Sequence, residues 1–289
     1  MEEQGRARIG FIGAGRLGLA LSRALARSGE RVVAAFSRDS ARCAALAAAI
    51  PGCRSMASPQ EVADAAGLVF LSVSDDAIAR VASQVRWRPR HAVIHCSGAA
   101  ELDVLAEARR QGAQTGSFHP LQLFSDPEVA AAGLSRCAIA LDGEPPLLGE
   151  LERLVAGLGA RPLRVPPGKR AAYHAASHYA AAFICVLFEE GEKILGALGI
   201  DAEQSGHALQ ALARGTLDAI AESGPARAMA GVYARGDVGT AARHLESLER
   251  MGADSALYRE LAERSVRLAL EADRIDATQA AQLRALLGR

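Results

Sequence analysis

The chain has 289 residues, half of them hydrophobic, which is enough for a large buried core and two domains. Its 33 basic and 33 acidic residues are interspersed and cancel, so neither nucleic acid nor an anionic membrane surface is the expected partner. No unbroken apolar stretch is long enough for a membrane span, and the first residues lack a signal-peptide pattern. We therefore expect a cytoplasmic protein whose partner is a small molecule.

The cysteines are scattered along the chain without metal-ligand spacing, and their number is odd. We expect reduced thiols and no metal site at Cys43, Cys53, Cys96, Cys137 and Cys185.

A glycine-rich turn follows the first apolar run and leads into an amphipathic Leu/Ala segment. It reads Gly13-Ala14-Gly15-Arg16-Leu17-Gly18. In a dinucleotide-binding βαβ unit the first glycine allows the turn, the second lets the backbone approach the pyrophosphate, and the third lets the helix pack on the strand. The pyrophosphate also meets free N–H groups and the positive end of the helix dipole. These six residues are predicted cofactor contacts; the alternative is an ordinary glycine-rich turn that holds no cofactor.

The second apolar run ends in Ser37 and Arg38 rather than in an acidic residue. An NAD-selective site usually places Asp or Glu there to accept from the ribose 2′-OH, whereas Ser and Arg suit a 2′-phosphate. The sequence therefore predicts NADP. In the alternative, Asp39 reaches a ribose hydroxyl and Arg38 is simply solvated.

Up to Pro166, short apolar runs alternate with segments of helical period, which is typical of parallel βαβ units. The runs cover residues 9–12, 32–36, 68–73, 92–96, 117–119, 138–141 and 162–165. We predict a doubly wound, mostly parallel α/β sheet of the Rossmann type over residues 1–166. Such sheets bind ligands at the carboxyl ends of their strands, so the nicotinamide is expected over Ser72, Val73 and Ser74. Gly29 is expected to close the first helix, and Ser58 to cap a later one with Glu61.

After Pro167 the strand signals stop, and an all-α C-terminal domain is predicted over residues 167–289. Its helices are expected at 169–198, 202–222, 225–234, 238–251, 254–272 and 276–287. The first of these is almost wholly apolar from Ala171 to Leu187, so we expect it to be buried on most sides. Its many alanines suit a central helix between domains or across a dimer axis, and a homodimer is the expected assembly.

Three motifs occur in a fixed order: Gly116-Ser117-Phe118-His119-Pro120-Leu121-Gln122-Leu123-Phe124, Ala172-Tyr173-His174-Ala175-Ala176, and Arg235-Gly236-Asp237 with His244-Leu245. Together they resemble a bacterial family that pairs a Rossmann-like NADP-binding domain with a helical C-terminal domain of unknown function. The resemblance covers essentially the whole chain. More distantly, the chain is similar to prephenate dehydrogenase, pyrroline-5-carboxylate reductase, ketopantoate reductase and the β-hydroxyacid dehydrogenases. The resemblance implies an NADP-linked oxidoreductase fold, often dimeric, with the substrate between the domains.

The resemblance to prephenate dehydrogenases implies catalytic roles for Ser97 and His119, whose counterparts there meet the substrate hydroxyl. A histidine that titrates near neutrality can accept or donate the proton. Alternatively, His119 only fastens a loop against Pro120, and Ser97 caps the following helix. His174 and His178 lie four residues apart on one helix face, where His174 is predicted to line the substrate pocket. A metal half-site, or buried histidines bonded to carbonyl groups, are the other interpretations.

Arg235 has two interpretations: it clamps a substrate carboxylate, or it pairs with Asp237 while Asp237 caps a helix. Two positions depart from the family pattern, since Ala182 stands where Asn is usual and Ala230-Gly231-Val232 replaces Thr-Gly-Pro.

The sequence as a whole predicts an NADP(H)-dependent oxidoreductase that transfers a hydride to or from a small, carboxylated hydroxy, keto or imino compound. His119 is the predicted acid/base, Ser97 orients the substrate, and His174 closes the pocket. The alternatives are a non-catalytic NADP(H) redox sensor or regulatory protein, and an interaction scaffold without cofactor. An enzyme needs convergent polar groups near the nicotinamide, whereas a sensor could fill that space with side chains.

Overall fold

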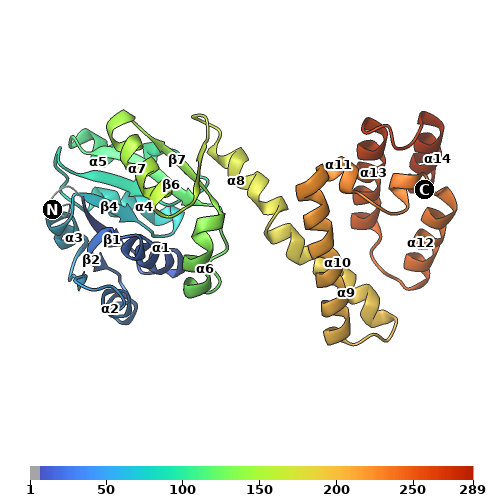
Figure 1. The fold of residues 1–289 in the computed structure, drawn as a ribbon, viewed down its shortest axis with the longest axis horizontal. Helices are drawn as coiled ribbons and strands as arrows, with labels where there is room; N and C mark the ends of the chain where they lie inside the picture. Colours follow the sequence, from blue (N-terminus) through green and yellow to red (C-terminus); the bar gives the residue numbers. More distant parts are fainter. Residues whose placement is uncertain (1–6, 289) are drawn as a thin grey trace. The chain divides into compact units, whose positions relative to one another are not determined.

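The computed structural model describes residues 7–288, which internal contacts divide into two compact units between Ala181 and Ala182 (Figure 1). The predicted domain boundary, after residue 166, lies where the sheet ends. Contacts assign the next helix, α8 (Arg170–Tyr179), to the first unit.

In the described residues the first unit contains one eight-stranded sheet with the order β3-β2-β1-β4-β5-β6-β7-β8. Neighbouring strands are parallel except β6 and β7, so the predicted doubly wound, mostly parallel sheet is confirmed. The strands are β1 (Arg8–Ile12), β2 (Arg31–Phe36), β3 (Arg54–Ser55), β4 (Leu68–Leu71), β5 (Ala92–His95), β6 (Gln114–Pro120), β7 (Ala138–Gly143) and β8 (Arg161–Arg164).

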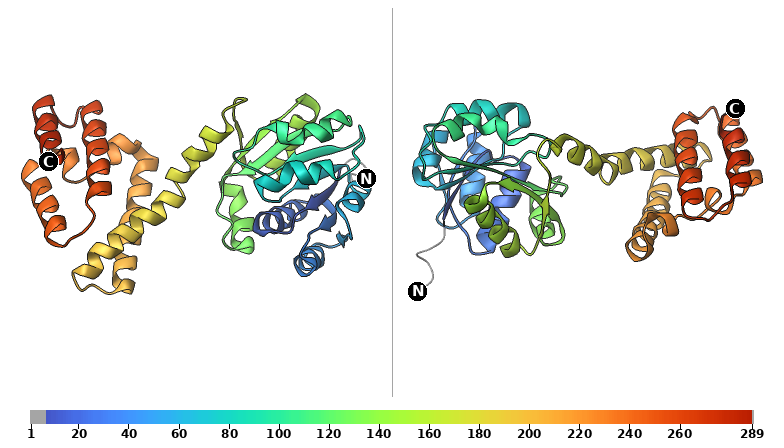
Figure 2. Two further views of the ribbon diagram at one scale, coloured as in Figure 1. Left: turned by 180° about the vertical axis from the view of Figure 1, so that it is seen from behind. Right: turned by 90° about the horizontal axis from the view of Figure 1, so that it is seen from above.

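Helices cover both faces of this sheet, as the views in Figures 1 and 2 show. One face packs against α1 (Arg16–Arg27), α2 (Ser40–Ala48), α6 (Pro127–Gly133) and α7 (Pro145–Gly157). The other face packs against α3 (Pro59–Ala65), α4 (Asp75–Ser83) and α5 (Ala106–Arg110). Two short 3₁₀ turns, Leu102–Leu105 and Leu134–Arg136, complete the connections.

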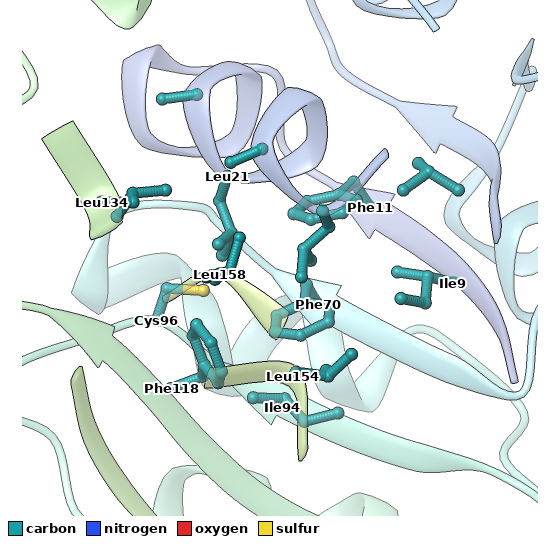
Figure 3. Packing of buried hydrophobic residues seen from close by; sticks show 14 of the residues in the cluster. Ile9, Phe11, Leu21, Phe70, Ile94, Cys96, Phe118, Leu134, Leu154 and Leu158 are labelled. Carbon is teal, nitrogen blue, oxygen red and sulfur yellow. The ribbon is translucent and has the colours of Figure 1, made fainter. Parts of the chain in front are cut away.

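Three phenylalanines from adjacent parts of the sheet form the centre of the larger core, where Figure 3 shows them side by side. Phe11 stacks on Phe70 with ring centroids 5.1 Å apart, and Phe70 meets Phe118 edge to face at 5.6 Å. All three side chains are fully buried, and each such burial contributes up to about 3 kcal/mol. This core holds the carboxyl ends of β1, β4 and β6 in fixed relation.

The helix boundaries follow local chemistry. Gly29 has φ +87° after the end of α1, a conformation that glycine adopts without steric penalty. Ser58 caps α3 by accepting from the Glu61 backbone N–H, while the Glu61 carboxylate accepts from the N–H of Ala57 rather than that of Ser58. The predicted starts and stops at these positions are confirmed.

The second unit is all-α, as predicted, and its own small core includes Leu245, Val266 and Leu283. The predicted helix over 169–198 is interrupted at Ala180 and Ala181, where i to i+3 hydrogen bonds tighten the chain into a turn. The predicted helix over 225–234 is also wrong, because Gly231 takes φ +97° and separates two short pieces. The helices are α9 (Ala182–Ala197), α10 (Ala202–Ser223), α11 (Pro225–Ala228), a 3₁₀ turn at Tyr233–Arg235, α12 (Val238–Arg250), α13 (Ala256–Glu271) and α14 (Ala277–Leu287).

The apolar helix that we expected to be buried on most sides is exposed in the single chain. α9 contains no buried residue, and Val186 and Leu187 each keep 44% of their surface accessible. In the described residues, the helical run Arg170–Ala197 is long and apolar enough, by length and composition alone, to cross a membrane. From the sequence we expected no membrane span, because polar residues such as His174 interrupt the apolar stretch. The run is nevertheless apolar on average.

Candidate functional site

The glycine-rich turn joins β1 to α1 and has the backbone that only glycines permit. Gly13 has φ +117°, and a Cβ there would lie 2.3 Å from the Ser72 carbonyl oxygen. A Cβ at Gly18 would lie 2.5 Å from the Gly13 carbonyl oxygen. Gly13 therefore makes the turn, and Gly18 brings α1 close to the ends of β1 and β4.

Gly15 differs from these two glycines, because a Cβ there would meet nothing within 4 Å. It precedes α1 in an extended conformation, and no side chain caps the helix. The N–H groups of the first turn are therefore open to a ligand, and the helix dipole favours an anionic one. This open cradle fits a pyrophosphate.

A cavity of about 570 Å³ lies over this turn, within the size range of small-molecule sites. Of the predicted cofactor contacts, Arg16, Leu17 and Gly18 are not among its lining residues. The predicted contacts that do line it are Gly13, Ala14, Gly15, Ser37, Arg38, Ser72, Val73 and Ser74.

Three arginines line this cavity: Arg38 and Arg42, which follow the end of β2, and Arg80 in α4. Asp39 caps α2: one carboxylate oxygen accepts from the Arg42 backbone N–H at 3.0 Å, and the other pairs with Arg42 Nε at 3.1 Å. Arg42 was not predicted from the sequence as a cofactor contact. Its position four residues after Arg38, in the first turn of a helix, could have indicated it.

A cluster of imidazole and phenol groups lies at the carboxyl end of β6. His119 Nδ1 is 2.9 Å from the Tyr173 hydroxyl, and the two rings are perpendicular. The His174 ring centroid lies 5.9 Å from that of His119 and 4.9 Å from that of His178. The structure thus brings the predicted residues His119 and His174 together, with Tyr173 as a partner that the sequence assigned no role.

Gly98 is the backbone position on which both imidazoles pack. A Cβ there would lie 2.5 Å from His174 Cδ2 and 2.8 Å from His119 Nε2. A side chain at this position would have to displace one or both imidazoles.

Burial sets the protonation of the pair at neutral pH. It lowers the pKa of His119 to about 4, helped by the nearby Arg170 and His174 and opposed by Asp75. Burial also raises the pKa of Tyr173 to about 12. A neutral imidazole and a protonated phenol therefore face each other, and they can share one proton through their hydrogen bond.

The hydroxyl of Ser97 is already engaged within the protein. It donates to the Asp75 carboxylate at 2.6 Å and accepts from the N–H groups of Ala99 and Ala100 at 3.1 and 2.9 Å. Ala99 and Ala100 lie before the 3₁₀ turn Leu102–Leu105, which has no side-chain cap, so Ser97 does not cap the following helix as the alternative interpretation expected. These bonds leave the hydroxyl little capacity to orient a substrate. Ser97 instead ties the end of β5 to the first residue of α4.

The remaining candidates have structural partners. His178 Nδ1 lies 3.0 Å from the His174 carbonyl oxygen, as in the carbonyl-bonded interpretation. In the second unit Asp237 caps α12 by accepting from the Thr240 N–H at 2.9 Å, as the capping interpretation predicted. Arg235 is exposed in the 3₁₀ turn before it. Across the described residues, no group of three or more His, Cys, Asp or Glu side chains is placed to hold a metal ion.

Comparison with protein families assigns both parts of the chain. Residues 2–120 match a Rossmann-like domain, and residues 137–265 match a domain of unknown function, DUF2520. The second match begins within the sheet, so it includes β7, β8 and α8 together with helices of the second unit. No curated protein matches the chain.

Solved structures share this fold over nearly the whole chain. A protein from Bacteroides fragilis, described as a proposed NADP oxidoreductase, is 22% identical with a TM-score of 0.73, covering 91% of this chain and 98% of its own. A reductive aminase from Aspergillus terreus, in complex with NADPH and ethyl levulinate, is 14% identical with a TM-score of 0.70, covering 96% and 98%. Pyrroline carboxylate reductase from Plasmodium falciparum, with NADP bound, is 12% identical with a TM-score of 0.61, covering 97% and 98%. At these identities the likeness shows a common fold.

Proposed function

Because the chain joins a Rossmann-like domain to a DUF2520 domain, we propose that it is an NADP(H)-dependent oxidoreductase acting on a small hydroxy, keto or imino compound. The observation that carries this proposal is the cavity that begins at the open N-terminus of α1 and is lined by Arg38 and Arg42. The reductive aminase and pyrroline carboxylate reductase of the same fold support the reduction of a C=O or C=N bond.

Residues of this chain are assigned to each part of the cofactor. The first turn of α1 would hold the pyrophosphate through its free N–H groups. Ser37, Arg38 and Arg42 would hold the 2′-phosphate, because guanidinium groups bind phosphate through charge-assisted hydrogen bonds. The segment from Ser72 to Ser74 would lie beneath the nicotinamide, which when bound supplies or accepts a hydride.

The proton is assigned to the His119–Tyr173 pair. His119 and Tyr173 do not themselves line the cavity. The hydrogen bond between Asp75, which follows the lining residue Ser74, and Ser97, which precedes Gly98, relates the two places. In the reductive direction the neutral pair would deliver a proton to the substrate oxygen or nitrogen, and in the oxidative direction it would accept one. His174 would line the pocket beside it. Such convergent polar groups favour an enzyme over a redox sensor or a scaffold.

The experiment that tests the cofactor assignment compares the affinity for NADPH and NADH by calorimetry. Arg38→Ala and Arg42→Ala should each weaken NADPH binding by about 10-fold or more and leave NADH binding nearly unchanged, since only NADPH carries the 2′-phosphate. Arg31→Ala, at the opposite end of β2, is the matched control and should change neither affinity. Equal affinity of the wild-type protein for both cofactors, or equal losses in the two variants, would contradict the assignment.

We infer further that two copies of the chain associate through the second unit. Its helices α9 and α10 leave large apolar side chains accessible in the single chain, among them Val186, Leu187, Leu212 and Leu217. A soluble chain seldom leaves so much apolar surface uncovered unless it has a binding partner. A second copy covers this surface without requiring another protein.

A further inference from the structure

The first turn of α8 is fastened to the segment that follows β5 by two hydrogen bonds from one residue. The Arg170 backbone N–H donates to Glu101 Oε1 at 3.0 Å, and its Nη2 donates to the Ser97 carbonyl oxygen at 2.8 Å. Lys169, which precedes the helix, makes no side-chain cap. Glu101 therefore caps α8 from a different segment of the chain.

This attachment decides where the phenol of Tyr173 lies. Tyr173 and His174 follow Arg170 by three and four residues, so they project from the same side of α8. Tyr173 meets His119, and His174 packs on Gly98, one residue after Ser97. The bonds from Arg170 thus fix the position of α8 relative to the Ser97–Gly98 backbone, on which His174 packs.

An attachment made by a buried arginine lowers the stability of the fold. Its side chain is 0% exposed, and its Nε and Nη1 atoms have no hydrogen-bond partner among the described residues. Burying a charge with unsatisfied donors usually destabilises a fold relative to an apolar side chain of similar size. A buried arginine with unsatisfied donors calls for a role beyond packing.

The charge of Arg170 also acts on the proton-transfer pair. The titratable and charged groups near His119 are Arg170, Tyr173 and His174 from α8, Asp75 from α4, and His95 from β5. Arg170 lowers the pKa of both His119 and His95. It therefore favours the uncharged imidazole, the form that can share the phenol proton.

We propose that Arg170 and Glu101 are positioning residues that hold the hydroxyl of Tyr173 against His119 Nδ1 and thereby prepare the pair for proton transfer. Their role in turnover rests on the proposed oxidoreductase function. The contact that they hold is a property of the protein without cofactor or substrate, so it is measured separately.

The test is nuclear magnetic resonance of the histidine ring nitrogens in the full-length protein, with His119→Gln used to assign the His119 signals. In the wild type we expect a neutral His119 ring with one dominant tautomer at pH 7 and little protonation at pH 6. In Arg170→Met, His119 should show mixed tautomers, and its titration midpoint should rise by about one pH unit or more. Arg170→Lys keeps the charge without the planar fork, so it should keep the midpoint low while the tautomers still mix.

Glu101 supplies a second pair of variants in case Arg170→Met fails to fold. Glu101→Ala removes the cap and should mix the His119 tautomers, whereas Glu101→Gln keeps an accepting oxygen and should restore one tautomer. Circular dichroism and thermal unfolding report whether each variant is folded. A folded Arg170→Met or Glu101→Ala protein with an unchanged His119 signal would overturn the proposal. Failure of the wild type to bind NADPH would instead contradict the proposed function. The His119 signals would still report on the contact with Tyr173, because they are measured without cofactor.

Discussion

Single residues decide how closely the functional groups approach, and Gly98 is the clearest case. We predict that Gly98→Ala displaces the imidazoles of His119 and His174, because its Cβ would lie 2.5 to 2.8 Å from their atoms. Such overpacking costs about 1 to 3 kcal/mol of stability. The histidine signals should shift, and thermal unfolding should occur earlier.

The control for that substitution is Gly67→Ala. A Cβ at Gly67 would meet only the Arg90 carbonyl oxygen, at 3.8 Å, which is ordinary contact. This variant should leave the His119 and His174 signals unchanged. If Gly98→Ala had as little effect as Gly67→Ala, the imidazoles of His119 and His174 would not pack closely on Gly98.

Histidines whose pKa is lowered in the folded protein make stability depend on pH, and among His91, His95 and His119 the last two have the larger shifts. Burial lowers the pKa of His95 to about 3 and that of His119 to about 4, from an ordinary 6.5. Between these values and 6.5 the unfolded chain binds more protons, so the unfolding free energy should fall as the pH falls below about 6.5. Each histidine contributes at most about 1.4 kcal/mol per pH unit. Urea unfolding at several pH values between 7 and 5 measures the slope.

His95→Asn separates this effect from the titration of acidic residues. His95 Nδ1 accepts from the Ser97 N–H at 3.2 Å, and an asparagine oxygen can take over that bond without titrating. The variant should be less stable at pH 7 but lose less stability between pH 7 and 5. An unchanged slope would show that His95 is not neutral in the native state.

Among single residues, the sequence predicted the glycines of the cofactor turn correctly but did not predict the hydrogen-bond partners of His119 and Ser97. Gly13, Gly15 and Gly18 follow from spacing, because their roles depend on the backbone of one continuous turn. The pairing of His119 with Tyr173 joins positions 54 residues apart, and no local pattern reports such a contact. Ser97 was assigned by analogy, but its hydroxyl is engaged by Asp75 from another helix.

Between elements, the salt bridge of α7 to the segment before β2 tests how the layers are held. Glu30 is 3% exposed and bonds Arg153 at 2.7 Å. Arg153→Met should lower the unfolding free energy by about 2 to 4 kcal/mol, because it removes the two hydrogen bonds that the Arg153 guanidinium donates to this buried carboxylate. Chemical denaturation at pH 7 measures this loss.

The matched control is Arg164→Met, which removes an exposed pair with Glu152 at 2.6 Å. Since both side chains there are nearly half exposed, the loss should be about 1 kcal/mol or less. Similar losses in the two variants would mean that the burial of Glu30 does not determine the strength of its salt bridge.

Sequence patterns located the long elements and missed the short ones. The seven predicted runs correspond to strands, and most of these runs are apolar over several residues. β3 has two exposed residues and thus no apolar signal. The turn at Ala180 and Ala181 was missed because alanine favours helix and gives no sign of a break.

At the scale of the whole molecule, the exposed apolar helices predict a homodimer. Sedimentation in buffer without detergent should show one species of twice the chain mass at micromolar concentrations. Val186→Lys should shift this equilibrium toward the monomer, because a charge in an apolar interface is costly to bury. Arg264→Ala, on the exposed side of α13, should leave the dimer intact.

A monodisperse monomer, or a protein that stays soluble only in detergent, would contradict the dimer. The second result would instead favour a membrane role for the apolar run Arg170–Ala197. The sequence indicated that this helix is apolar, but burial depends on what covers it. The sequence pattern of a single chain does not reveal whether a second copy covers an apolar helix.

We propose that one site holds NADP(H) and the proton-transfer pair together. A crystal structure of the protein with NADP bound tests it most directly. We expect the 2′-phosphate to contact Arg38 and Arg42, and the reactive nicotinamide carbon to face a space bordered by His119 and Tyr173. A nicotinamide that points away from both side chains, or a 2′-phosphate free in solvent, would contradict the account.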